Sequence, residues 1–195
     1  MIAHIYWLFF LILLILFAVF LVIVFRHPGQ VVGRREKSPA AVRLGAILQS
    51  LSYMIAWTLR RPEVVPFGGK GLWPLAAVAF LSLALAVGAI ALVVAAKKHL
   101  GRQWALAARV VEGHKLVTDG PFAVVRHPIY LAMGLLLLSP VIGFSSWLGA
   151  GLSIALFAAG TVLRIRAEED VLAQAFGGEY AEYRERVPAF LPRLG

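Results

Sequence analysis

Long uncharged apolar segments limit what this chain can fold into. The first, residues 5–25, is an unbroken apolar run that would be about 31 Å long as a helix, enough to cross a bilayer. Hydrophobic residues make up 61% of the 195, and charged residues only 15%, against roughly a quarter in a typical soluble domain. A soluble fold of this size could not bury so much apolar surface. The sequence therefore predicts an all-α integral membrane protein.

Four further segments have the composition of membrane helices. They are residues 42–59, 72–96, 129–144 and 146–163. The first of these is the least apolar and carries Gln49, Ser50 and Ser52, which we expect to face other helices rather than lipid. The last two are separated by a very short turn, which predicts a helical hairpin. The prediction is one domain with five transmembrane helices.

The distribution of positive charge predicts an orientation. The net charge is +9, and 16 of the 19 lysines and arginines fall on one side of the membrane if all five helices cross it. The positive-inside rule makes that side the cytosol, with the N-terminus outside and the C-terminus inside. The expected partners of these charges are membrane lipids. No nucleic acid is expected, because the charges are spread over several loops rather than gathered on one basic helix.

The last apolar helix continues beyond the predicted membrane segment. No glycine or proline occurs between Leu163 and Gly177, and residues 179–186 then predict a short amphipathic helix. Arg164 and Glu168 are four residues apart and share a helix face, a spacing typical of a surface ion pair. Their position just outside the bilayer also favours a cavity. Glu169 is expected to point elsewhere, into solvent.

The polar stretch at residues 114–130 leads directly into the fourth apolar segment. Pro128 fits the first turn of a helix and restrains His127 toward an extended conformation. His127 would then lie at a helix N-terminus, where the partial positive charge suits an anionic or carboxylate-bearing ligand. The same pattern also fits a helix start beside an interfacial tyrosine. The tripeptide Arg-His-Pro recurs at residues 26–28, where no helix was expected to follow, and there it predicts a stop at the membrane surface.

The part of this stretch before His127 leaves two interpretations open. Residues 114–117 fit an ordinary loop, but residues 118–121 have turn chemistry that would fold them back toward His127, where backbone groups could bind an adenine edge. The sequence has no cysteine, no glycine-rich dinucleotide or phosphate motif, and no Gly-x-Ser-x-Gly elbow. Its histidines do not have metal-ligand spacing, so no metal cofactor is expected.

In combination, these segments resemble the isoprenylcysteine carboxyl methyltransferase family. The shared features are His-x-Leu-Val-Thr-x-Gly-Pro-Phe, Arg-His-Pro-x-Tyr, a helical hairpin, Arg-x-x-x-Glu-Glu-x-x-Leu and Phe-Gly-x-x-Tyr-x-x-Tyr, in this order over about residues 97–192. The resemblance divides the chain into residues 1–96, with three membrane helices, and residues 97–195, a methyltransferase-like region. It implies an S-adenosylmethionine-dependent enzyme with its cofactor pocket in the C-terminal half, on the cytosolic side.

The resemblance also implies roles for particular residues. The cofactor would contact His114, Leu116, Val117, Phe122, His127, Pro128, Ile129, Tyr130 and Glu168. Arg164 would face the carboxylate of a lipophilic, isoprenylcysteine-like or prenylated substrate. Phe122 stands where the family often has tyrosine. A carboxylate is ionised at neutral pH, so methylating it needs alignment and exclusion of water rather than a general base.

Two other functions remain open from the sequence. A membrane reductase of the steroid or sterol kind, using NADPH, has a somewhat similar C-terminal half. A non-catalytic membrane scaffold would bind neither cofactor. For the methyltransferase, a lipid tail is expected to enter sideways between the third and fourth membrane helices.

Overall fold

Five helices and one short 3-10 helix make up the part of the chain that the structure describes. The computed structural model describes residues 2–26, 40–61, 72–101 and 115–191. The elements are α1 (Ile2–Phe25), α2 (Ala40–Thr58), α3 (Leu72–Leu100), η2 (Gly120–Ala123), α4 (Pro128–Phe144) and α5 (Trp147–Arg186). The five predicted helices are confirmed within a few residues, although α3 ends at Leu100, four residues beyond the predicted end at residue 96.

The fold is that of an all-α membrane protein. Among the described helices, α1, α3 and α5 are long and apolar enough to cross a bilayer, and α4 is a shorter apolar helix. α2 carries more polar residues than α1, α3 or α4. That α2 and α4 also cross the membrane stays a prediction, as does the orientation of the bundle.

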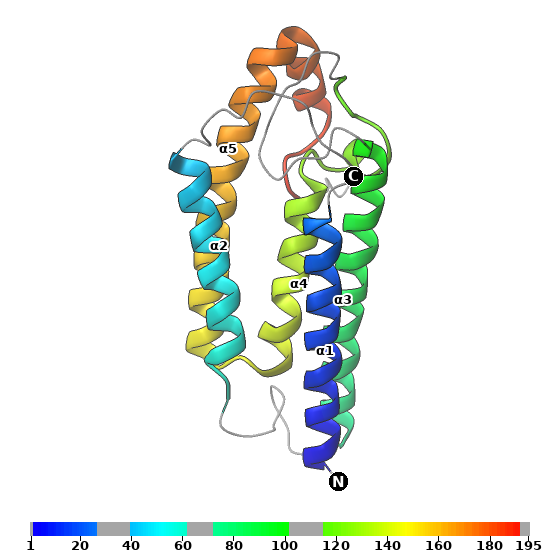
Figure 1. The fold of residues 1–195 in the computed structure, drawn as a ribbon, viewed down its shortest axis with the longest axis vertical. Helices are drawn as coiled ribbons and strands as arrows, with labels where there is room; N and C mark the ends of the chain where they lie inside the picture. The colour runs from blue at the N-terminus through cyan, green and yellow to red at the C-terminus, as the bar shows by residue number, and fades with distance from the viewer. Residues whose placement is uncertain (1, 27–39, 62–71, 102–114, 192–195) are drawn as a thin grey trace.

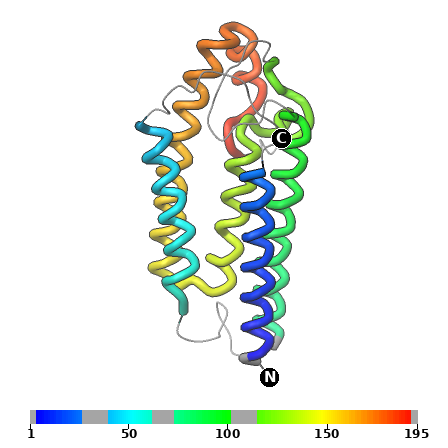
Figure 2. Tube along the Cα trace, in the orientation of Figure 1, coloured from blue at the N-terminus to red at the C-terminus, as the bar shows by residue number. Residues whose placement is uncertain are grey.

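The helices form two groups, which Figures 1 and 2 show side by side. One group is α2 packed along α5, and the other is α1, α3 and α4. Small α3 residues, including Ala89 and Ala96, are fully buried and belong to the face that lets the neighbouring helices approach closely. Because α3 packs against α4, the sideways entrance expected between the third and fourth membrane helices is wrong.

Two glycines hold α2 against α5. A Cβ atom on Gly45 would lie 2.6 Å from the carbonyl oxygen of Gly160, and one on Gly160 would lie 2.6 Å from the carbonyl oxygen of Gly45. Gln49 and Ser52 are buried in the bundle, as expected from the sequence, whereas Ser50 is exposed and donates to Ala46 of its own helix. The crossing therefore depends on the absence of side chains at two facing positions.

The two groups are joined firmly at the end where α4 turns into α5, which we call the hairpin end. The hydroxyl of Ser145 donates to the Ala56 carbonyl at 2.6 Å, and the Arg61 side chain donates to the Ile142 carbonyl at 2.9 Å. The Ser146 hydroxyl accepts from Gly149 and caps α5. Away from this end α4 and α5 diverge, and the space between the groups widens toward the opposite end, the pocket end (Figure 1).

The long helix α5 bends sharply at Gly177. This residue has φ 51° and ψ −121°, a conformation that favours glycine, and the chain after it folds back. Tyr180, Tyr183 and Val187 then pack against Leu116, Leu172 and Phe176. The break predicted after Phe176 is confirmed, and it returns the end of the chain to the pocket end of the bundle.

We expect Gly160→Ala to destabilise the protein by about 1–3 kcal/mol, because the new methyl group would collide with backbone of α2 rather than with a movable side chain. The measurement is the thermal unfolding midpoint in detergent. The control is Gly151→Ala on the same helix, where nothing lies within 4 Å of the added Cβ. That control should be neutral or slightly stabilising, since alanine favours helix. Equal midpoints for the two variants would contradict the close crossing.

Candidate functional site

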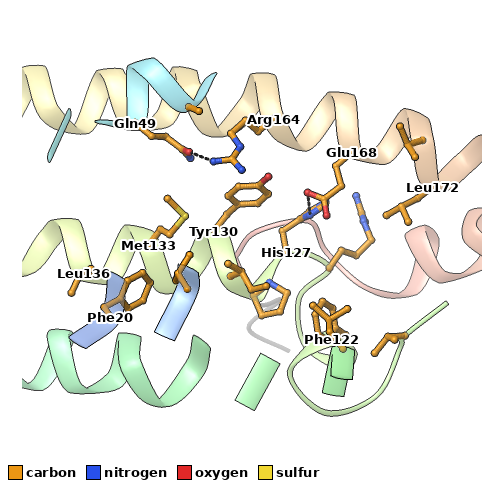
Figure 3. A pocket seen from close by; sticks show the side chains of 18 of the residues that line it. Phe20, Gln49, Phe122, His127, Tyr130, Met133, Leu136, Arg164, Glu168 and Leu172 are labelled. Carbon is orange, nitrogen blue, oxygen red and sulfur yellow. Dashed lines mark hydrogen bonds and ion pairs between the residues drawn. The ribbon is translucent and has the colours of Figure 1, made fainter. Parts of the chain in front are cut away.

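A cavity of about 430 Å³ lies between the two helix groups, toward the pocket end. Its wall has an apolar part and a polar part, several residues of which are seen in Figure 3. The apolar part includes Phe17, Phe20, Leu21, Val24, Tyr53, Met133 and Leu136, from α1, α2 and α4. The polar part includes Gln49, Arg126, His127, Tyr130, Arg164 and Glu168. An elongated molecule with one charged end would match this division.

The structure brings together nine of the ten site residues predicted from the sequence. The cavity is lined by Leu116, Val117, Phe122, His127, Pro128, Ile129, Tyr130, Arg164 and Glu168. His114 lies outside the described residues. Residues on both sides of the predicted domain boundary line the cavity, because α1 and α2 supply much of its apolar wall. The division of the chain at residue 96 stays a prediction.

His127 lies at the start of α4, as predicted, and faces two carboxylates. Pro128 occupies the first turn, and His127 has φ −123° and ψ 62°, less extended than expected. Its backbone N–H donates to the Ala189 carbonyl at 3.0 Å. The buried ring lies with Nδ1 3.8 Å from Glu168 Oε2 and Nε2 3.2 Å from Glu169 Oε1. Two carboxylates of α5 thus lie next to the N-terminus of α4, where negative charge is favourable.

The prediction that Glu169 points into solvent is wrong. Its side chain is only 14% exposed, and its carboxylate accepts from Arg126 Nη2 at 2.6 Å and Nε at 3.1 Å. On an isolated helix, Glu169 lies off the face that Arg164 and Glu168 share, and solvent exposure was expected for that reason. In the folded chain, the loop that carries Arg126 and His127 lies against α5, so adjacent glutamates both reach it.

Partners of Glu169 also shift its proton affinity. Burial raises the pKa of the Glu169 carboxyl, but hydrogen bonds from His127 and Arg126, together with the Arg126 charge, outweigh burial and lower the pKa to about 2. This carboxylate lies on the charged part of α5, beyond its apolar segment. It is therefore ionised throughout the physiological pH range.

Arg126 connects the loop before α4 to the end of the chain. Besides binding Glu169, its Nη1 donates to the carbonyls of Arg184 and Val187, and its backbone N–H donates to Pro188 at 2.8 Å. Arg126 had no predicted role in the site. Its signal was its place in the Arg-His-Pro-x-Tyr motif, but its partners lie 43 to 62 positions later in the chain, and local spacing does not indicate them.

Phe122 is fixed by its backbone as well as by its ring. The Phe122 side chain is buried at the cavity wall, and its carbonyl accepts from the Tyr183 hydroxyl at 2.6 Å. The predicted turn at residues 118–121 is present as the start of η2. Gly120 within it has φ +57°, and a Cβ there would overlap the His99 ring. The turn therefore requires glycine at this position.

Arg164 lies between α2 and α4. Its guanidinium is 5.1 Å from the centre of the Tyr130 ring, and its Nη1 donates to Gln49 Oε1 at 2.7 Å (Figure 3). Gln49 was not among the predicted site residues. The signal for it was a long polar side chain inside an otherwise apolar segment, which the sequence analysis used only to orient the helix.

One end of the cavity has the groups to hold a cation that carries a large ring. Glu168 supplies a partly exposed carboxylate, and Leu172 and Phe176 supply apolar surface next to residues 115–117. The Tyr180 hydroxyl is buried at the cavity wall. The chemistry at this end of the cavity thus suits a bulky organic cation.

We expect Glu169→Gln to lower stability by about 1–3 kcal/mol near neutral pH, because it removes the charge paired with Arg126. The folded pKa lies below the ordinary value of 4.5, so this contribution is complete above pH 4.5 and is lost as the pH falls toward 2. The measurement is the difference in unfolding midpoint between wild type and variant across this range. Glu179→Gln, at an exposed position on the same helix, should show no such difference.

Comparisons with known proteins match the region that contains most of this site. The model of the isoprenylcysteine carboxyl methyltransferase family matches residues 81–174, just under half of the chain. A cobalt-zinc-cadmium resistance protein, CzcN, of Cupriavidus metallidurans is 42% identical over 100 residues, which are 49% of this chain and 44% of that protein.

Two plant and yeast proteins match over a similar length. Protein-S-isoprenylcysteine O-methyltransferase B of Arabidopsis thaliana is 40% identical over 85 residues, 42% of this chain and 41% of that protein. Protein-S-isoprenylcysteine O-methyltransferase of Schizosaccharomyces pombe is 39% identical over 87 residues, 42% of this chain and 34% of that protein. The chain thus spans less than half the length of these relatives. Residues 81–174 of the chain are therefore similar to the isoprenylcysteine carboxyl methyltransferase family.

Proposed function

We propose that this chain is a membrane methyltransferase that uses S-adenosylmethionine to esterify the carboxylate of a lipophilic acceptor. The observation that carries the proposal is one cavity whose wall changes from apolar side chains to Arg164, Tyr130 and Glu168. A chain region that matches the model of a carboxyl methyltransferase family supplies most of this wall. A lipophilic molecule that ends in a carboxylate would bind with its carboxylate at the polar part of the wall and its tail along the apolar part.

Arg164 is the proposed partner of the acceptor carboxylate. Arginine suits this task because its planar guanidinium can donate two parallel hydrogen bonds to both oxygens of a carboxylate. Its position against Tyr130 and Gln49 places the cation where the apolar wall ends. The carboxylate would be held there while its tail remains among apolar side chains.

The cofactor would occupy the end of the cavity near Glu168. We assign cofactor contacts to His114, Leu116, Val117, Phe122, His127, Pro128, Ile129, Tyr130 and Glu168. The Glu168 carboxylate would attract a positively charged ligand, and the aromatic and apolar side chains would cover its ring. Arg126 and Glu169 act behind these residues, because they fix the position of His127 and of the loop before it.

The proposed chemistry makes few demands on the protein. When bound, S-adenosylmethionine supplies a methyl group on a positively charged sulfur. The acceptor carboxylate oxygen forms a bond to this methyl carbon while the carbon–sulfur bond breaks, and its electron pair stays on sulfur. No proton moves, because the carboxylate is already ionised at neutral pH. The protein has only to align the two molecules and exclude water, and the buried walls of the cavity suit that role.

An isoprenylcysteine-like molecule is the acceptor we favour. Two relatives carry the name protein-S-isoprenylcysteine O-methyltransferase, and such molecules have an apolar chain and a free carboxylate. The proposed partners are therefore this acceptor and the surrounding lipids. The pocket end, with the emerging charged part of α5, would lie on the cytosolic face, where soluble cofactor is available. Residues 97–195 would form the methyltransferase-like region, and residues 1–96 the supporting membrane helices.

A reductase that uses NADPH is the less favoured candidate, because the family model and two of the named relatives are methyltransferases. A scaffold without a ligand would have no use for the polar side chains that line the cavity.

Replacing the proposed carboxylate partner provides a direct test. We expect Arg164→Met to lower methyl transfer from labelled S-adenosylmethionine to N-acetyl-S-farnesylcysteine about 30- to 150-fold, the loss of about 2–3 kcal/mol of charge-assisted hydrogen bonding. The matched control is Arg166→Met, at an exposed position two residues along the same helix, which should stay within about twofold of wild type. The proposal fails if wild-type protein in lipid vesicles transfers no methyl group.

We further propose that acceptors enter sideways between α1 and α2. Side chains of both helices line the cavity, including the exposed or half-exposed Leu21, Phe25 and Ser50, so the cavity reaches the lipid-facing surface there. This entrance replaces the one expected between the third and fourth membrane helices, which the packing of α3 on α4 closes.

A bulky side chain at this entrance should exclude long acceptors first. We expect Ala46→Phe to raise the KM for a farnesylated acceptor about tenfold or more and to affect a short S-alkyl cysteine acceptor much less. Ile47→Phe serves as the control, because Ile47 is 55% exposed and lies outside the cavity wall. Equal KM values for Ala46→Phe and wild type would rule out entry by this route.

A further inference from the structure

We infer that Gln49 is a positioning residue that holds the Arg164 guanidinium in place with a neutral oxygen, so that this anchor does not itself neutralise the cation that would meet the acceptor. The inference rests on the proposed function, because it assumes that Arg164 meets a carboxylate. Gln49 belongs to α2, outside the residues that match the family model. It is therefore a contribution of this chain's own N-terminal helices to the site.

The contacts of Gln49 fix both ends of its amide. The side chain is 2% exposed, accepts from Arg164 Nη1 at 2.7 Å and donates from Nε2 to the Thr161 hydroxyl at 2.9 Å. A guanidinium has only donors, so the amide oxygen has to face Arg164 and the amide nitrogen has to face Thr161. The geometry thus permits one orientation of the amide.

The backbone around Gln49 prevents the amide from moving away. Gly45 and Gly160 bring α2 and α5 so close that no Cβ fits at either position. A Cβ on Gly160 would also lie 3.1 Å from Gln49 Cγ, which shows how tightly this side chain is packed against α5. Gln49, Thr161 and Arg164 are therefore held in register by the same helix crossing.

Orientation matters because a two-point contact with a carboxylate is directional. The two N–H groups have to lie in the plane of the carboxylate, so the guanidinium plane has to be fixed before the acceptor arrives. Tyr130 lies against the guanidinium on α4, and Gln49 binds one of its nitrogens from α2. Together they hold the plane from two helices.

A neutral amide at position 49 affects the charge of the site differently from a carboxylate at the same position. An acidic residue at position 49 would bind the guanidinium at least as well, since a carboxylate has nearly the shape of the amide. It would also neutralise the cation and repel an anionic acceptor inside a poorly solvated site. Glutamine keeps the geometric support and leaves the charge uncompensated from that side.

The test is Gln49→Glu, which preserves size and the hydrogen bond to Arg164. Binding of N-acetyl-S-farnesylcysteine and of its methyl ester is measured by calorimetry in detergent, for the full chain. Wild type should bind the acid at least about tenfold more tightly than the ester, and Gln49→Glu should abolish this preference while ester binding stays within about twofold. Gln174→Glu, which adds the same charge at an exposed position of α5, should behave as wild type.

Three other results would each contradict the role inferred for Gln49. If Gln49→Glu keeps the preference for the acid, the inference is wrong, although methyl transfer by wild type would still support the proposed function. If the variant loses acid and ester binding equally and unfolds at a lower temperature, Gln49 has a purely structural role and the inference is also wrong. If wild type shows no preference for the acid yet transfers methyl groups, Arg164 does not bind the carboxylate, and the inference fails with that assignment alone.

Discussion

The ion pair between Arg126 and Glu169 is the contact on which the pocket end depends. The two helix groups are joined by hydrogen bonds at the hairpin end and diverge from there, so something has to connect them again at the other end. Arg126 does this, because it binds Glu169 on α5 and backbone carbonyls of the returning C-terminal segment. The pocket is the space left between these two points of closure.

The wall of the pocket follows from how its helices are joined. Glycines at positions 45 and 160 bring α2 onto α5 and place a buried amide beside Arg164, while Gly177 returns the chain so that its tyrosines cover the opposite side. Polar groups gather where the helices leave the apolar part of the bundle, and an apolar chamber remains behind them. This gradient is what suits the site to a lipid with a charged head, and it arises from several helices rather than from any one motif.

Sequence patterns predicted the helices well and the contacts between them less well. Long apolar runs and the position of Pro128 and Gly177 act locally, through burial and backbone conformation, so they give helix boundaries directly. Nine of the predicted site residues line the cavity, and a combination of motifs marked them in the sequence. Glu169, Arg126 and Gln49 were misplaced or passed over, because their partners are 43 to 115 positions away, beyond the reach of local spacing.

By itself, the sequence determined an all-α membrane protein, the order and approximate length of its helices, and the set of residues around the start of the fourth helix. These properties depend on hydrophobicity and on backbone preferences, which each segment carries alone. Only the tertiary structure decided that α3 closes against α4, that α1 and α2 border the cavity, that Glu169 is bound to Arg126, and that Gln49 holds Arg164. The reason is physical: a side chain's partner is set by how the helices pack, and packing depends on all of their surfaces at once.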